Sequence, residues 1–511
     1  MLESISSGLI LLAATPVVLL IVLLGFLKMP GEKSAFITLV VTILIAIFGF
    51  ELSVNDTALS VLYGVIKAVF PILIIILMAI YSYNVQVQTE KIEVIKQQFS
   101  AISEDKAIQV LLLTWGFGGL LEGMAGFGTA VAIPAAILIS LGFKPMFSAV
   151  VSLVANSVPT AFGAVGIPVI VLAREVDMAD QITTISANVV WQLAILMFLI
   201  PFVILTLTSK SVKSIPRNII LGGVTGAVTL AVQYYSAVYI GAETPAILGS
   251  IASIFVIIAF GKITAKKNTE KKEAINFSGK EIFQAWSVYG LILILVLLTS
   301  PLFPITAWLK ENVTIFQTVF SFDIAGAARK VGIYWLTDTG VLIFVSSIVG
   351  GLIQGSSLSK LFKLLGKTTL QLKKTVITVS CLIALSTLMD FSGMISVLGL
   401  ALAAGTGAFY PFFAPAIGAL GTFLTGSDTS SNILFGKLQA TVADQIGADK
   451  GWLAAANTAG ATGGKIISPQ SIAVATTACN QQGQEGVILK RAIVFALVYI
   501  IIAGIVVYIG S

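Results

Sequence analysis

The chain has 511 residues, of which 57% are hydrophobic and 11% are charged, and it contains no histidine. A soluble protein of this length carries roughly 25% charged residues, so the composition indicates a polytopic membrane protein. The formal net charge of +6 comes from lysines in short loops between apolar runs. That pattern orients a protein in a bilayer and does not indicate nucleic-acid binding. Without histidine, a histidine proton relay, a histidine metal ligand and a histidine-containing triad are all excluded.

Apolar runs of about 17 to 25 residues predict membrane spans. In chain order they cover residues 7–27, 34–50, 61–83, 186–207, 216–235, 245–261, 284–300, 336–354, 374–390 and 490–510. Two further runs, 146–173 and 452–479, contain Asn and Pro and predict broken spans, which gives about 12 spans. Residues 86–101 and 356–370 predict interfacial helices. Residues 391–405 are apolar enough to form another span, which would change the orientation of everything after them.

Residues 105–142 predict a re-entrant hairpin. Its arms, 105–121 and 127–142, are joined by a glycine-rich turn. An arm of about 16 residues is roughly 24 Å long as a helix, which is short for a comfortable crossing. The same reasoning predicts a second hairpin at 410–445, with its tip at 426–432.

Each predicted hairpin precedes a broken span, and the two hairpin–span pairs align with each other. The aligned positions are Glu122-Gly123 with Thr425-Gly426, Asn156 with Asn457, and Pro168 with Pro469. Interrupted segments at matching places in two halves point to a transporter's binding site. An N-terminus outside puts most Lys and Arg residues in cytoplasmic loops and gives the two pairs opposite orientations. The sequence therefore predicts inverted repeats in an N-terminal half (1–261) and a C-terminal half (284–511), joined by a cytoplasmic linker (262–283).

Three ionisable residues lie in this apolar framework, where such residues are functional candidates by default. Glu122, at the first tip, is a candidate proton carrier because desolvation favours a neutral carboxyl. The alternatives are a helix cap or an ion pair with a lysine. Asp428 lies in the polar second tip and either caps a helix or belongs to a site. Lys465 needs a partner, which could be Glu122, Asp428 or a substrate carboxylate, unless it snorkels to the surface.

Polar side chains around the tips and breaks are further candidates for substrate binding. The second tip offers hydroxyl and amide groups at a helix start, where free N–H groups suit a carboxylate. Asn156 and Asn457 could either fix freed backbone groups or bind substrate, with Thr458 and Ser157 as weaker companions. No nucleophile–base set, metal-ligand spacing or dinucleotide motif is present, so we expect no enzyme, no metal and no cofactor.

These segments resemble the bacterial L-lactate permease family, which also includes glycolate permeases. The matching blocks are Leu121-Glu122-Gly123, Ala125–Gly128, Gly142–Pro145, Ala161–Ala164, Gly166–Pro168, Leu424–Asn432, Ala455–Thr458 and Lys465–Ala473. The resemblance covers most of the chain and fades at 262–283 and 301–335. It implies import of L-lactate, and of related D-lactate and glycolate, with a proton across the bacterial cytoplasmic membrane.

The family is also similar to a wider ion-transporter superfamily. This similarity implies an all-α polytopic fold with two re-entrant hairpins in inverted repeats, an elevator-type motion and a possible homodimer. Among the ionisable residues of the apolar segments, Glu122 and Asp428 are the candidates for proton coupling. The candidate substrate-binding residues are Asn156, Ser427, Thr429, Ser430, Asn432, Asn457, Thr458, Lys465 and Gln470.

Two alternatives stay open. One is a sodium-coupled carboxylate carrier of the same superfamily. The first tip, Gly123–Gly126, lacks the Ser-Asn-Thr triplet found in sodium-coupled members, which favours a proton. The more distant alternative is an integral-membrane enzyme.

Overall fold

The computed structural model describes residues 7–27, 29–100, 105–126, 128–209, 211–264, 277–299, 303, 308–309, 312–481 and 484–511. Within them, ten helices are long and apolar enough to cross a membrane, or up to 12 if each bent pair is one span. The protein is therefore a helical, polytopic membrane protein, as its composition predicts. Most of the predicted linker, residues 265–276, lies outside the described residues.

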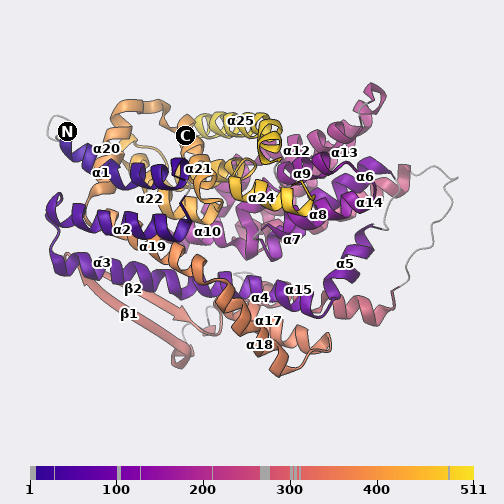
Figure 1. Cartoon of the computed structure of the whole chain (residues 1–511), viewed down its shortest axis with the longest axis horizontal. Helices are drawn as coiled ribbons and strands as arrows, with labels where there is room; N and C mark the ends of the chain where they lie inside the picture. Colours follow the sequence, from indigo (N-terminus) through magenta and orange to yellow (C-terminus); the bar gives the residue numbers. More distant parts are fainter. Residues whose placement is uncertain are drawn as a thin grey trace.

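One group of helices, here called the bundle, contains α7, α8, α21 and α22, which flank the two tips (Figure 1). It consists of α6 (Lys106–Leu111), η4 (Leu112–Phe117), α7 (Gly118–Met124), α8 (Thr129–Ser140), α9 (Pro145–Ala155), η5 (Pro159–Phe162), α10 (Gly163–Glu175), η6 (Ala179–Gln181), α11 (Ile182–Gln192), α12 (Ala194–Thr208), η7 (Val212–Ser214), α13 (Ile215–Tyr239), α14 (Pro245–Thr264), α21 (Tyr410–Thr425), α22 (Asp428–Ile446), α23 (Lys450–Lys465), α24 (Pro469–Ala478) and α25 (Glu485–Ile509). Helix α10 packs on α22, and α11 packs on α23, so the two halves of the chain interlock.

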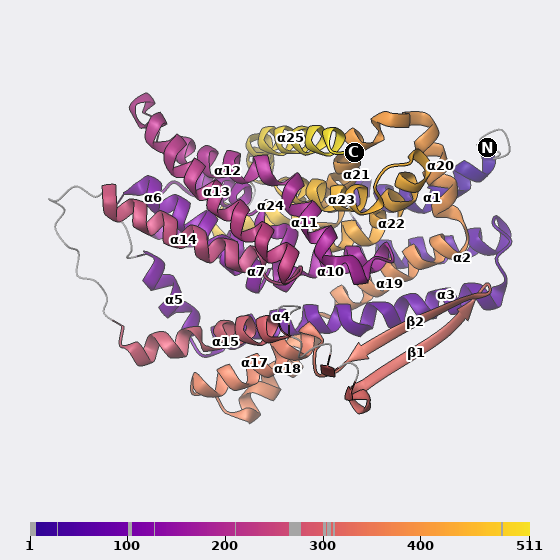
Figure 2. The ribbon, with the colours of Figure 1, turned by 180° about the vertical axis from the view of Figure 1, so that it is seen from behind.

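A second group, here called the frame, lies along one side of the bundle (Figures 1 and 2). It consists of α2 (Gly31–Phe48), α3 (Val54–Lys67), η3 (Ala68–Leu73), α4 (Ile74–Gln88), α5 (Lys91–Ser100), α15 (Gly279–Leu298), η8 (Thr314–Phe316), β1 (Gln317–Ile324), β2 (Ala327–Tyr334), α17 (Thr339–Ile353), α18 (Leu358–Gln371) and α19 (Lys373–Phe391). Helix α19 packs on α2 and α3 within the frame and touches α22 of the bundle. The connecting helices are α1 (Ser7–Ile21) with η2 (Val22–Phe26), and α20 (Met394–Thr406) with η9 (Gly407–Phe409).

Several predicted spans differ in detail from the helices. The run at 61–83 belongs to one apolar stretch, Val54–Gln88, in which Phe70 leaves helical geometry (φ −120°, ψ 114°). The run at 186–207 is a pair of helices bent by 46°. Between α9 and the η5–α10 segment the chain bends by 55°. Proline accounts for the second of these bends, because Pro159 begins η5 and cannot donate a helical hydrogen bond.

The break at the start of α10 is a run of left-handed backbone. Ala164, Val165 and Gly166 have φ values of 46°, 58° and 79°. A β-branched residue such as Val165 rarely adopts this conformation, and such strain gathers at functional sites. A side chain at Gly166 would start 2.1 Å from the carbonyl oxygen of Ala242, so this position requires glycine.

Residues 317–334 form an antiparallel two-stranded ribbon that the sequence left unassigned. Gln317 pairs with Tyr334 and Ile324 with Ala327. The two-residue turn, Ala325-Gly326, has positive φ at both positions, which matches the twist of a hairpin. Aromatic side chains hold the ribbon against α3 and η3, with ring centroids 5.3 Å apart for Phe322 and Tyr63 and 6.1 Å apart for Phe320 and Phe70.

Candidate functional site

A cavity of about 320 Å³ lies where the two tips and the two breaks of the bundle meet the frame. Such a volume is at the small end of the range for ligand pockets. The bundle lines it from both halves of the chain. The frame contributes Gly31, Glu32, Ile76, Lys374, Thr375, Thr378 and Val379.

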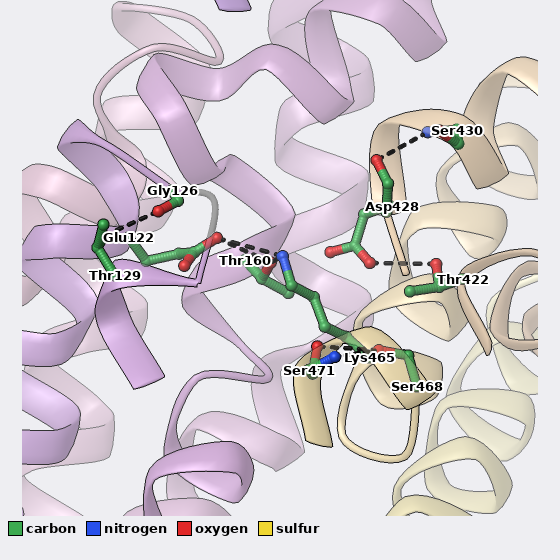
Figure 3. A network of polar contacts seen from close by, with 11 residues as sticks. Glu122, Gly126, Thr129, Thr160, Thr422, Asp428, Ser430, Lys465, Ser468 and Ser471 are labelled. Carbon is green, nitrogen blue, oxygen red and sulfur yellow. Dashed lines mark hydrogen bonds and ion pairs between the residues drawn. The ribbon is translucent and has the colours of Figure 1, made fainter. Parts of the chain in front are cut away.

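Lys465 and Glu122 form an ion pair in this cavity, with 3.4 Å between Nζ and Oε1. Glu122 lies on α7 and Lys465 ends α23, where the helix dipole favours a cation. Thr160, in η5, bridges them: its hydroxyl accepts from Lys465 Nζ at 2.6 Å and donates to Glu122 Oε1 at 3.0 Å (Figure 3). Of the alternatives that the sequence left open, the structure therefore shows an ion pair between Glu122 and Lys465. This pair joins the N-terminal and C-terminal halves of the chain.

Asp428 lies across the cavity from Glu122, with Lys465 between them (Figure 3). Its Oδ1 accepts a hydrogen bond from Thr422 at 3.1 Å, and its Oδ2 has no partner among the described residues. The ammonium of Lys465 attracts both carboxylates. Asp428 is not the helix cap, because Ser427 caps α22 and accepts from the Ser430 N–H. The cavity thus contains one cation and two anions from these three residues.

The remaining predicted residues divide into two groups. Those that line the cavity are Asn156, Ser427, Thr429, Ser430 and Gln470. The second group, Asn432, Asn457 and Thr458, is fully buried behind it. Asn432 donates to Thr458 and to the Pro168 carbonyl, both at 2.9 Å, and accepts from Asn457 at 2.9 Å. These contacts join α22, α23 and α10, so in this structure the second group supports the cavity wall without lining it.

The helix N-termini that border the cavity include those of α8, α22 and α24. Helix α8 begins after Gly128, α22 begins at Asp428, and α24 begins at Pro469, next to Gln470. Gly128, Asp428 and Gln470 all line the cavity. Because free N–H groups and the positive dipole end favour anions, this arrangement suits a carboxylate. Within the described ranges no group of three or more His, Cys, Asp or Glu residues could hold a metal ion.

Sequence reasoning missed Thr160 and Thr422, the hydroxyl partners of the two cavity carboxylates. Thr160 follows Asn156 by four residues and adjoins Pro159, so its position in the interrupted segment marked it as a candidate. Thr422 precedes the second tip and carries no comparable signal, because a threonine in a membrane helix commonly bonds its own backbone.

The family model of the L-lactate permeases matches residues 9–511. The chain belongs to the L-lactate permease family. It is 39% identical to an L-lactate permease from Streptococcus iniae over 87% of this chain and 93% of that protein. It is 34% identical to glycolate permease GlcA from Escherichia coli (strain K12) over 97% of this chain and 94% of that protein.

Membership of this family makes the chain a membrane transporter and not an enzyme. With its candidate spans, the permease is a multi-pass bacterial membrane protein. Among solved structures, the MtrF antimetabolite efflux pump of Neisseria gonorrhoeae matches 88% of this chain and 83% of its own at 12% identity, with a TM-score of 0.46. That likeness is too distant to inform the site.

Proposed function

We propose that this permease imports L-lactate and related small 2-hydroxycarboxylates, such as D-lactate and glycolate, by symport with a proton. Two relatives named for L-lactate and glycolate support the substrate class. A small cavity bordered by helix N-termini supports a small carboxylate as the ligand. The cavity charge carries the proposal: Lys465 faces both Glu122 and Asp428.

The charges explain why a proton would accompany the anion. One ammonium and two ionised carboxylates give a net charge of −1, and an added lactate would make it −2. Concentrating unbalanced charge at membrane depth is costly. A proton bound with each lactate keeps the net charge at −1. Binding of substrate and proton would therefore favour each other, which is what symport requires.

We assign the proton to Asp428 and the role of internal counter-ion to Glu122. Glu122 has a cation and a hydroxyl within hydrogen-bonding distance through Lys465 and Thr160. Oε2 of Glu122 is also unpartnered among the described residues, but Asp428 makes no ion pair there. Asp428 accepts one hydrogen bond from Thr422 through Oδ1, and its Oδ2 is unpartnered within the same ranges. That oxygen is the position at which a proton would be added. The lactate carboxylate would compete with Glu122 for Lys465.

The transport cycle would follow from inverted repeats. We propose that the pairs 105–142 with 146–173 and 410–445 with 452–479 are inverted repeats, and that the bundle moves against the frame in an elevator-type motion. The cavity borders both groups, so such a motion would change which side of the membrane it reaches.

Labelled L-lactate uptake by purified protein in sealed liposomes tests the proposal. An inward proton gradient should drive accumulation, whereas an inward sodium gradient at equal internal and external pH should not. Asp428→Asn should lose proton-driven accumulation and keep exchange of lactate for lactate. Accumulation driven by sodium alone would overturn the coupling, and absence of lactate transport would overturn the substrate.

A further inference from the structure

The two aligned asparagines differ in their surroundings. Asn457 is fully engaged: Nδ2 donates to Asn432 at 2.9 Å and to Ser431 at 3.3 Å, and Oδ1 accepts from Gln439 at 3.2 Å. Asn156 is 3% exposed, yet neither Nδ2 nor Oδ1 has a hydrogen-bond partner among the described residues. Leaving a buried amide unpaired costs stability, so such a group calls for a partner.

The unpaired amide of Asn156 lies in the wall of the substrate cavity, together with Lys465 and Gly128. A ligand there could supply the missing partner. An amide offers two N–H donors and one acceptor oxygen. The substrate carboxylate can only accept, and Lys465 and the helix N-termini already suit it. A hydroxyl both donates and accepts, so it can satisfy Oδ1 and Nδ2.

We propose that Asn156 recognises the 2-hydroxyl group of the substrate and determines the preference for 2-hydroxycarboxylates over simple carboxylates. The inference rests on the proposed function and adds the residue that reads the second functional group. Three kinds of ligand should therefore differ in affinity, in the order in which they can satisfy the amide of Asn156. A 2-hydroxy acid can satisfy both ends of the amide, a 2-keto acid only the N–H groups, and an unsubstituted acid neither.

The size of the discrimination follows from burial. A site built to hydrogen-bond a hydroxyl rejects the analogue that lacks it, because the protein group is then left unpaired. For one amide in a partly open cavity we expect at least about a tenfold preference for lactate over propionate. A purely apolar site would instead favour propionate, which is less strongly hydrated.

Competition in proteoliposomes tests the proposal. Unlabelled L-lactate, pyruvate and propionate would compete with labelled L-lactate for uptake by wild type and by Asn156→Leu, which keeps the branched shape of the side chain without the amide. In the wild type, propionate should inhibit at least about tenfold more weakly than lactate, with pyruvate between them. In Asn156→Leu, the lactate inhibition constant should rise toward that of propionate, which should stay within about twofold of its wild-type value.

Ser157→Ala is the matched control. It removes the neighbouring buried polar group, whose hydroxyl donates to the Val154 carbonyl at 2.7 Å, and it should keep the wild-type ratio. If Asn156→Leu does not fold, Asn156→Ala with thermal unfolding in lactate or propionate gives the same comparison.

Two results would overturn the inference while leaving the proposed function in place. One is a wild type that does not discriminate between lactate and propionate, and the other is an Asn156 variant that binds both ligands equally more weakly than wild type. Absence of lactate uptake by the wild type would instead overturn the proposed function, and this inference with it.

Discussion

The hydroxyl of Thr160 joins the two opposite charges of the cavity. It accepts from Lys465 and donates to Glu122, which keeps the ammonium 3.4 Å from the carboxylate. Without the hydroxyl, the two charges can close up, and the substrate carboxylate must then displace a tighter ion pair. Thr160→Val should therefore raise the KM for lactate by roughly tenfold, measured as initial uptake into proteoliposomes. Thr160→Ser should restore the wild-type KM, and an unchanged KM in Thr160→Val would contradict this role.

Glu122 should stabilise the empty carrier more than the loaded one. Glu122→Gln leaves Lys465 without its paired carboxylate, at a cost of about 1–3 kcal/mol, less than for a fully isolated charge because Asp428 stays nearby. Lactate can then supply the missing carboxylate. Without lactate, the variant should unfold at a lower temperature than wild type. Added lactate should raise the unfolding temperature of the variant by more than it raises that of wild type.

Exposed residue Glu93 provides the control for this measurement. It pairs with Lys96 at 2.7 Å, and its side chain is 57% exposed. Because exposed ion pairs contribute little to stability, Glu93→Gln should change neither the unfolding temperature nor its increase on addition of lactate. A smaller lactate effect in Glu122→Gln than in wild type would mean that Glu122 binds the substrate itself.

At the level of single residues, sequence reasoning recognised charges more readily than their partners. Glu122, Asp428 and Lys465 stand out because ionisable groups are rare in apolar helices. Asn156 and Asn457 look equivalent in the sequence, yet the structure leaves one unpaired and surrounds the other with amides. That difference depends on residues far apart in the chain, so no local pattern contains it.

At the level of elements, a network of ion pairs joins the C-terminal end of α10 to the middle of α22. Lys67 of α3 pairs with Glu175 at 3.2 Å, and Lys437 of α22 pairs with both Asp177 and Asp390. Because Lys67 and Asp390 belong to the frame, the network also ties the bundle to the frame.

The Asp177–Lys437 pair should not contribute to the pH dependence of transport. Burial opposes ionisation of Asp177, but the hydrogen bond and charge of Lys437, together with the charges of Lys67 and Arg329, outweigh it and hold the pKa of Asp177 below its ordinary value of 3.8. A lowered pKa gives stability that is complete above the ordinary value and lost only as pH falls through the lowered one. Asp177→Asn should therefore leave the shape of the uptake–pH profile between about pH 5 and 8 unchanged. A displaced profile would show that this network, and not the cavity alone, responds to protons.

Most membrane helices could be predicted because twenty consecutive apolar residues are a local property of the sequence. The ribbon at 317–334 could not, because its stability depends on rings such as Tyr63 and Phe70 about 250 residues earlier. The sharp bend at Leu193 was also missed, since residues 186–207 read as one continuous apolar run.

At the level of the whole molecule, the cavity borders both the bundle and the frame, so relative motion of these groups is the simplest way to expose it alternately. Lys437 provides a matched pair of cross-links, because it contacts Asp390 of the frame and Asp177 of the bundle. Each double variant would have cysteines in place of Lys437 and one of its two partners, Asp390 or Asp177. The native Cys381 and Cys479, both buried, would be replaced by alanine.

Cross-linking with a reducible, thiol-specific linker should then distinguish motion of the bundle against the frame from motion within the bundle. Linking positions 437 and 390 should reduce lactate uptake to background, and reductant should restore it, because the bundle can no longer move against α19. Linking positions 437 and 177 joins two parts of the bundle and should leave uptake at the level of the unlinked double variant. Full uptake with the first link in place would rule out an elevator-type motion at this contact and favour a local gate at the hairpin tips.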